Sequence, residues 1–197
     1  MWRVERIDAI LIEDVREGDI AALAALVEKY KRMAYRVAIK ITRNHEDAND
    51  VVQDAFLKTY DSIHRFRMDS SFETWLYRIV VNLSLNVVKR KKIRGECALS
   101  KETINQATKD VKRRVEVKND PSIQAEKQEL REWVTKAVES LPVHHRTVVI
   151  LHELEGLTHS EIASILNCSV STVRTRLHYA RKRLRELLKP YVDSIAN

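Results

Sequence analysis

The sequence predicts an all-α fold, in which two small helical domains are joined by a flexible linker. Apolar residues recur at helical spacing over long stretches of the chain. Only three glycines and three prolines are present among 197 residues, whereas hairpins and sandwiches need both residue types at their turns. A hydrophobic content of 44% is sufficient for packed cores and argues against wholesale disorder.

The N-terminal part begins with the pattern of three helices. A short helix is expected to end at Gly18, and Asp19 can cap a long helix whose apolar stripe runs from Ile20 to Ile41. Asn44 begins the next helix, which has acidic residues in its first turn, as the helix dipole prefers. The apolar residues of this third helix are Ala48, Val51, Val52, Ala55, Phe56 and Ile63.

A break at residues 65–69 precedes a fourth helix. Ser70 and Glu73 have the spacing of a capping box at its start. Trp75 shares the apolar register of this helix, which favours a core position over the alternative role of a wedge between DNA strands. The other apolar residues in that register are Phe72, Leu76, Ile79, Val80 and Leu83.

Residues 93–124 differ from the segments on either side because they are polar, charged and weakly periodic. This composition is typical of a linker, with at most transient helix around 101–116. The linker divides the chain into a first domain at 1–92 and a second at 125–197.

The net charge of +7 is unevenly placed. Residues 89–118 carry 11 basic and 4 acidic residues, so this segment alone accounts for the excess of the whole chain. A concentrated basic segment suits a polyanion, because binding releases counterions. A membrane surface would also attract it, but no apolar anchoring face accompanies the charge.

The second domain is expected to contain helices over 130–141 and 143–154, followed by a helix-turn-helix. Thr158 and Glu161 form a capping box for the first helix of that pair, and Ser169 is placed to cap the second. In a helix-turn-helix the second helix enters the major groove of DNA, with its N-terminal residues at the base edges.

The second helix of this pair has an almost entirely basic outward face. Six Arg and Lys residues lie between positions 174 and 185, against the single acid Glu186 that follows. A solvated helix face usually mixes both signs, so the pattern favours DNA binding over the alternative of an ordinary charged surface.

Other functional classes find little support in the sequence. Cys97 and Cys168 are far apart and lack metal-ligand spacing, which favours two free thiols in a reducing cytosol. No apolar run approaches the ~18–20 residues of a membrane span, and residues 1–20 lack the apolar segment of a signal peptide. His152 and Glu153 do not continue into a zinc-hydrolase motif, and no Gly-rich phosphate loop occurs. We therefore expect a cytoplasmic protein that is not an enzyme and uses no cofactor, metal or small-molecule substrate.

Three ordered segments resemble signatures of the extracytoplasmic-function (ECF) sigma factors of bacterial RNA polymerase, in the sigma-70 family. They are Asp47–Phe56, Phe72–Asn82, and Leu141–Val148 with Glu153–Thr158. The resemblance covers nearly the whole chain, and it implies core RNA polymerase and promoter DNA as partners. It also implies signal-dependent control, such as a stress response, and an anti-sigma factor as a further partner.

The resemblance assigns core-polymerase binding to the acidic face of the third predicted helix. Asp50, Gln53 and Asp54 are spaced i, i+3 and i+4, so they share one face opposite the apolar stripe. An ordinary polar surface is one alternative. A cation site near His45 is another, although carboxylates alone specify no coordination geometry.

Recognition of the −10 promoter element is implied for the loop at 66–71 and the helix that follows it. A base flipped out of the duplex needs a stacking surface and polar groups at its edge. A solvent loop and surface polar residues are the structural alternatives. The implied residues are Phe66, Arg67, Ser70, Ser71, Arg78, Asn82 and Asn86.

Recognition of the −35 element in duplex form is implied for the helix-turn-helix. Tyr179 departs from the family pattern, in which a second basic residue is frequent at this place, so a thymine methyl or a sugar is its alternative contact. The implied residues are Arg174, Thr175, Arg176, His178 and Tyr179.

Two other classes of protein are alternatives for a chain with a helix-turn-helix. A stand-alone regulator would need a ligand pocket or a phosphoacceptor Asp in an α/β domain, and the Gly-poor helical N-terminal half predicts neither. A recombinase would need a nucleophile or a carboxylate cluster, and the sequence suggests none.

Overall fold

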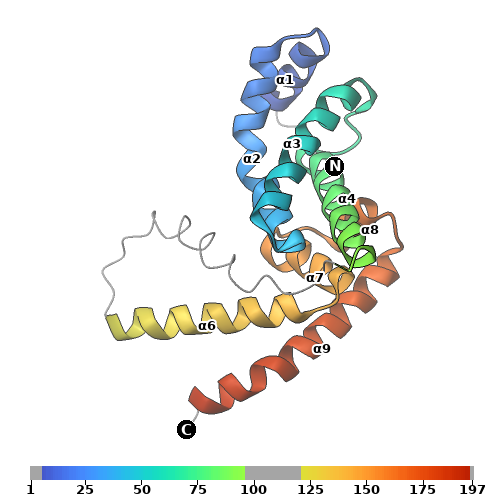
Figure 1. Cartoon of the computed structure of the whole chain (residues 1–197). Coiled ribbons are helices and arrows are strands. Elements are labelled where there is room, and N and C mark those ends of the chain that lie inside the picture. Colours follow the sequence, from blue (N-terminus) through green and yellow to red (C-terminus); the bar gives the residue numbers. More distant parts are fainter. Residues whose placement is uncertain (1–5, 96–120, 196–197) are drawn as a thin grey trace.

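The computed structural model describes residues 6–95 and 121–195, and all regular structure in these two ranges is helical (Figure 1). The all-α class is therefore confirmed. In chain order the elements are α1 (Arg6–Arg16), α2 (Ile20–Thr42), α3 (His45–Ser62), η1 (Ile63–Arg65), α4 (Phe72–Ile93), α6 (Pro121–Ser140), α7 (Val143–Val149), η3 (Ile150–Leu154), α8 (His159–Leu166) and α9 (Val170–Ile195).

The helices α1 to α4 form the first helical body, in which α2 packs against α1, α3 and α4. The Asp19 side chain accepts from the Ala21 backbone N at 2.7 Å, and the Asn44 side chain accepts from the Asp47 backbone N at 2.9 Å. Both caps were predicted, because an oxygen-bearing side chain satisfies N–H groups that have no partner within the helix. The buried centre of this body includes Ile12, Leu26, Ala34, Val37, Ile41, Val51, Ala55, Phe72, Leu76 and Val80.

The cap of α4 differs from the prediction by one residue. Ser71 has extended backbone angles, and its hydroxyl accepts from the Thr74 backbone N at 3.0 Å. The predicted capping box of Ser70 with Glu73 is therefore wrong. The helix begins at Phe72, so the position three residues after the true cap is Thr74 and not an acid.

Three aromatic rings close the end of this body beside the 66–71 loop. The Trp75 ring centroid lies 5.0 Å from that of Phe66 and 5.8 Å from that of Phe72. Trp75 is half-buried and packs against the core, which agrees with the core position that its register predicted. Tilted and edge-to-face rings at this spacing add to the stability that burial alone provides.

The segment between the two helical bodies is described only at its ends. The helix α4 continues to Ile93 and α6 begins at Pro121, so both enter the range 93–124 that was predicted as a linker. The predicted transient helix at 101–116, and Cys97, lie outside the described residues.

The second body consists of α6, α7, η3, α8 and α9. The predicted helix over 143–154 is present, but its second half has π-helical hydrogen bonding from Ile150 to Leu154. The predicted capping box is confirmed: Glu161 N donates to the Thr158 hydroxyl, and Thr158 N donates to the Glu161 carboxylate at 2.7 Å. The buried centre includes Val148, Ile150, Leu151, Ile162, Ile165, Val173 and Leu177.

The helix-turn-helix is formed by α8 and α9. Asn167 ends α8 in the left-handed region, with φ 49°, a conformation that Asn tolerates better than most residues. The Ser169 hydroxyl then accepts from the Thr172 backbone N at 3.1 Å, so Ser169 caps α9 as predicted.

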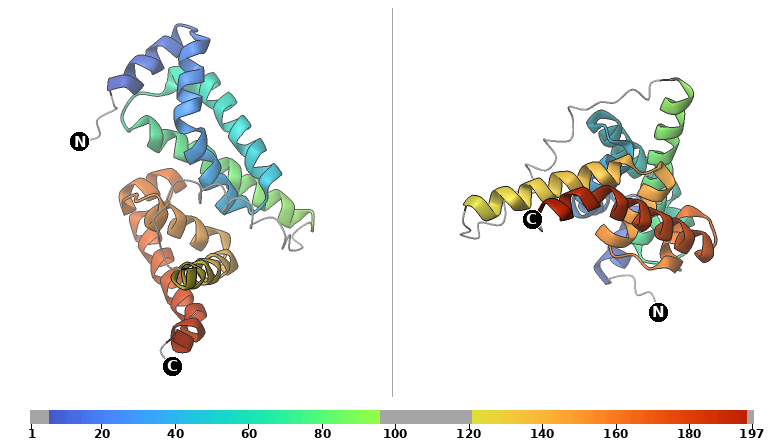
Figure 2. Two further views of the ribbon diagram at one scale, coloured as in Figure 1. Left: turned by 90° about the vertical axis from the view of Figure 1, so that its left-hand side faces the viewer. Right: turned by 90° about the horizontal axis from the view of Figure 1, so that it is seen from below.

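The two bodies are in contact. The helix α4 lies against α8, and α2 lies against α7 and η3 (Figures 1 and 2). Within the described residues, no helix is both long and apolar enough to cross a membrane.

Candidate nucleic-acid interface

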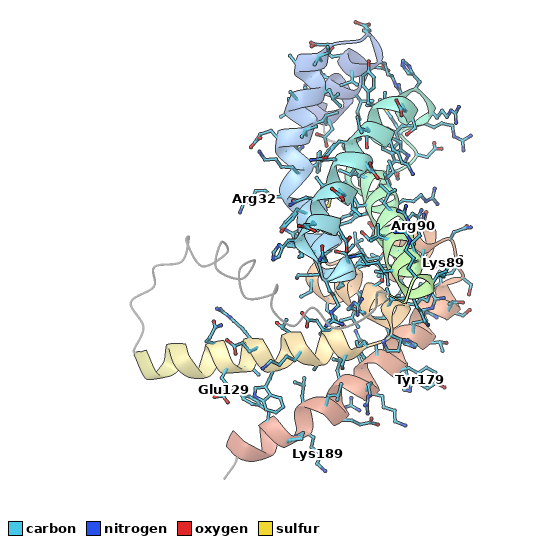
Figure 3. The ribbon with its side chains drawn as sticks, viewed as in Figure 1. Arg32, Lys89, Arg90, Glu129, Tyr179 and Lys189 are labelled. Carbon is cyan, nitrogen blue, oxygen red and sulfur yellow. The ribbon has the colours of Figure 1, made fainter. Side chains whose placement is uncertain are left out.

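The N-terminal half of α9 presents most of the predicted −35 residues to solvent. Arg174, Thr175, His178 and Tyr179 are exposed, and Arg176 is half-buried. The Tyr179 side chain projects from α9 in Figure 3 and is 57% exposed. Because Ser169 caps the helix, the first turn of α9 is fixed and its N-terminal residues are held outward.

A hollow of about 470 Å³ lies along this helix. Its lining has several cationic groups and no acidic residue, which suits the phosphates of a DNA backbone. The sequence assigned Arg174 and His178 to the −35 site, whereas it counted Arg181, Lys182 and Arg185 only as part of the basic face of this helix. The lining residues are His159, Arg174, Leu177, His178, Arg181, Lys182 and Arg185.

The helix α8 contributes a histidine to the rim of the hollow. The rings of His152 and His159 lie 4.8 Å apart. Slight burial, followed by the nearby His152 ring and the charges of Arg174 and Arg181, lowers the pKa of His159. The His159 ring is therefore neutral at pH 7, and it offers one donor and one acceptor beside the charged groups.

The loop that precedes α4 offers fewer groups than its sequence suggested. Phe66 is only 3% exposed and packs on Phe72 and Trp75, so in this structure it is a core residue and not an available stacking surface. From the sequence, the whole 66–71 loop was expected at the surface, although Phe66 is its most apolar residue. Ser71 is engaged in the α4 cap. Arg67 remains exposed and forms an ion pair with Asp69 across 3.3 Å.

The helix α4 presents the remaining predicted −10 residues. Asn82 and Asn86 are exposed and lie one turn apart. The Arg78 guanidinium donates to the Ser164 carbonyl oxygen of α8, from Nε at 3.2 Å and from Nη2 at 2.7 Å. Arg78, which the sequence assigned to DNA binding in the first body, is therefore hydrogen-bonded to the second body in this structure. The sequence did not indicate this contact.

The three predicted polymerase-binding residues on α3 share an exposed face. Asp50, Gln53 and Asp54 are all solvent-accessible, and α3 buries the opposite side against α2 and α4. Two large apolar side chains on the same helix, Leu57 and Tyr60, are 65% and 45% exposed, and the sequence did not single them out. An acidic face with adjacent apolar groups is suited to a protein partner. In the part of the chain that the structure describes, no group of three or more His, Cys, Asp or Glu residues is arranged to hold a metal ion.

Comparison with known proteins assigns each of the two helical bodies to a protein family. Residues 26–93 match the family model "Sigma-70 region 2", and residues 131–184 match "Sigma-70, region 4". The chain is also 36% identical over 193 residues to the ECF RNA polymerase sigma-E factor of Escherichia coli strain K12, a match that covers 94% of this chain and 96% of that relative. The chain is an ECF sigma factor of the sigma-70 family.

One further relative and two solved structures are also similar to this chain. The sigma-E factor of Haemophilus influenzae is 36% identical over 187 residues, which cover 93% of this chain and 96% of that relative. The fold resembles that of CnrH in complex with the cytosolic domain of CnrY, with a TM-score of 0.65, 24% identity, and coverage of 94% and 99% of the two chains. It also resembles the sigma factor RpoE in complex with the anti-sigma factor NepR from Bartonella quintana, with a TM-score of 0.60, 21% identity, and coverage of 84% and 96%.

A cluster of residues between the two bodies of this sigma factor was missed by sequence reasoning. The Glu155 carboxylate, whose side chain is 1% exposed, accepts from Arg36 Nε at 2.8 Å and from the Tyr77 hydroxyl at 2.8 Å. Arg146 is also buried and donates to the Ile41 carbonyl oxygen at 2.8 Å. These partners are far apart in sequence, so no local pattern could have joined them.

The charges around Glu155 hold it ionised. Burial by itself raises the pKa of Glu155, but the hydrogen bonds from Arg36 and Tyr77, with the charges of Arg36 and Lys40, outweigh it and hold the pKa below its usual value. Burial, followed by the neighbouring Glu155 carboxylate, raises the pKa of Tyr77 far above its usual value. The Tyr77 hydroxyl therefore remains a donor to an ionised carboxylate at neutral pH.

Proposed function

We propose that this ECF sigma factor divides promoter recognition between its two bodies, with domain 2 at 1–92 and domain 4 at 125–197. The capped, exposed start of α9 and the cationic hollow beside it support duplex recognition of the −35 element by domain 4. This arrangement is the observation on which the proposal chiefly depends.

Within domain 4, we assign base contacts to Arg174, Thr175, His178 and Tyr179, and a phosphate contact to Arg176. A guanidinium can donate two hydrogen bonds to the major-groove edge of guanine, and such a contact discriminates against the wrong base by ~1–3 kcal/mol. We add Arg181, Lys182 and Arg185 as backbone contacts, since they line the same hollow as Arg174.

Domain 2 is proposed to bind the −10 element after strand opening. Arg67, Ser70, Asn82 and Asn86 offer polar groups for an extruded base and its neighbours, and Arg78 offers a phosphate contact once it is released from Ser164. We also assign Ser71 to the −10 surface, because it lies beside Ser70. Phe66 supports the shape of the loop from the core, because its ring is buried against Phe72 and Trp75.

The α3 face at Asp50, Gln53 and Asp54 is proposed to bind core RNA polymerase, because it is acidic, exposed and placed on a rigid helix. We infer that the chain positions the polymerase and is not itself an enzyme. It would act in the cytoplasm, where the polymerase and the promoter are found. An anti-sigma factor is proposed as a regulatory partner, since a sigma factor of similar fold, RpoE, has been solved in complex with the anti-sigma factor NepR.

Run-off transcription tests this function. Core polymerase should give no defined transcript from a pool of genomic promoters, and addition of the chain should give discrete transcripts and stable copurification with core. Copurification without any specific transcript would contradict the proposal, and so would transcripts that do not depend on the chain.

A further inference from the structure

Histidines are concentrated in domain 4 of this chain. Five of the seven in the sequence lie there, at positions 144, 145, 152, 159 and 178. His159 and His178 line the cationic hollow along α9, and a further histidine, His152, lies beside His159. An unperturbed histidine changes its charge near neutral pH, so the charge of the hollow depends on pH.

His159 is the lining residue that α8 contributes, whereas the others come from α9. The two helices pack against each other, and His159 lies in the first turn of α8 (Figure 1). In a helix-turn-helix the first helix crosses the DNA backbone while the second lies in the major groove. A phosphate group in the hollow would therefore meet His159 on one helix and the arginines of α9 on the other.

His152 supports the His159 ring from η3. The two ring centroids lie 4.8 Å apart, with an angle of 31° between the ring planes. His152 Nδ1 donates to the Leu157 carbonyl oxygen at 2.9 Å, because a carbonyl oxygen can only accept. The backbone thus orients the His152 ring, and His159 packs beside a fixed partner at the rim of the hollow.

The surroundings of His159 disfavour a further positive charge in the free chain. The nearby carboxylates already have partners, since Glu153 of η3 accepts from Arg181 at 3.0 Å and Glu161 caps its own helix. From α4, Arg78 binds at the other end of α8. The groups of α9 that share the hollow with His159 are cationic or titrate to a cation: Arg174, His178, Arg181, Lys182 and Arg185.

A bound phosphate would reverse this balance. In the free chain, burial followed by the nearby His152, Arg174 and Arg181 lowers the pKa of His159, so its ring is neutral at pH 7. An opposite charge close to the ring favours the protonated form and raises the pKa again. The protonated ring also has two N–H donors, whereas the neutral ring has one.

We propose that His159 is a further DNA-backbone contact of the −35 site, which takes up a proton when duplex DNA binds and so makes binding tighter at mildly acidic pH. The inference rests on the proposed function, because it takes the docking of α9 on duplex DNA from there. It adds a contact on α8 and a pH dependence to the contacts that were assigned on α9.

The sign of the effect follows from proton linkage. The DNA complex holds the proton more tightly than the free chain does, so affinity rises as pH falls through the pKa of His159 in the complex. The gain levels off below the lower pKa of the free chain. A difference of about one unit between these two pKa values corresponds to a factor of about ten in affinity. We therefore expect binding to tighten roughly threefold to tenfold between about pH 7.5 and about pH 6.

The test compares the full-length wild type with three variants. His159→Gln removes the titratable group, and His159→Lys replaces it with a permanent charge. His64→Gln is the matched control, because it makes the first change at an exposed histidine of η1 in domain 2. Fluorescence anisotropy at both pH values and one salt concentration measures affinity for a mixed-sequence duplex of about 20 base pairs, since a backbone contact is independent of sequence. Circular dichroism at both pH values verifies folding.

We expect the wild type and His64→Gln to show the full gain in affinity on acidification, and His159→Gln to keep about twofold or less, to which His178 contributes. His159→Lys should bind more tightly than the wild type at the higher pH and gain about twofold or less on acidification. NMR titration of the His159 ring, identified by the signal that is missing in His159→Gln, should give a higher pKa with the duplex than without it.

An equal gain in His159→Gln and the wild type would overturn the inference, and so would a pKa of His159 that the duplex does not raise. Full pH dependence in His159→Lys would contradict it as well. Run-off transcription by the wild type, measured in parallel, separates this result from the proposed function. Specific transcripts together with either negative result mean that only the role of His159 is wrong, whereas absence of specific transcripts contradicts the proposed function.

Discussion

Reversal of two charges on α3, by Asp50→Lys together with Asp54→Lys, should weaken binding to core polymerase by roughly a hundredfold or more. Both side chains are exposed on one face of the helix and lie one turn apart. A partner surface that is complementary to acids would then meet two like charges, which both slows association and weakens the complex. Titration of labelled sigma factor with core polymerase measures the loss.

The matched control reverses two acids elsewhere. Glu129 and Glu132 are exposed on α6 of the other domain, and Glu129 is visible on that helix in Figure 3. Glu129→Lys with Glu132→Lys makes the same change in net charge and should leave core affinity within about threefold of the wild type. An equal loss in both double variants, or a loss of the helical dichroism of the α3 variant, would contradict a specific binding face.

The substitution Arg174→Ala should weaken binding to a duplex −35 element by roughly fivefold to more than a hundredfold, the range that a bidentate contact to guanine covers. Arg174 lies in the first turns of α9, where a recognition helix meets base edges, and it lines the cationic hollow. Core binding should not change, because α3 lies in the other domain. Fluorescence anisotropy with duplex DNA and with core polymerase gives both numbers.

Arg183→Ala is the control for this prediction. It removes the same charge from the same helix, but nine residues at 100° each place Arg183 on the side opposite Arg174. Arg183 is exposed and pairs with Glu186 across 3.2 Å. Its substitution should change duplex affinity by no more than about threefold. If the two variants lost affinity equally, Arg174 would act through general charge and not through base recognition.

Most of the fold could be predicted from the sequence because its determinants are local. Asp19, Asn44 and Thr158 each cap a helix within three residues of themselves, so residue type and spacing are sufficient. The start of α4 shows the limit of this reasoning. Ser70 and Ser71 are equivalent as capping residues, and only the packing of Phe72 in the core decides which of them lies outside the helix.

The candidate site was predicted less completely because burial depends on contacts between distant segments. Phe66 follows a helix break and has the sequence context of a loop, yet its ring fills a gap beside Phe72 and Trp75. Arg36 and Glu155 are 119 positions apart, and each by itself resembles an ordinary surface charge. Helical periodicity assigns a residue to a face of its own helix but not to the partner that covers that face.

Sequencing of promoter DNA selected by the reconstituted holoenzyme tests the division of promoter recognition most directly. The account predicts two blocks of preferred bases separated by a constant spacer, and selection with Arg174→Ala holoenzyme should weaken the upstream block while the downstream block persists. A single block in the wild-type selection, or the joint loss of both blocks in the variant, would contradict recognition by two separate domains.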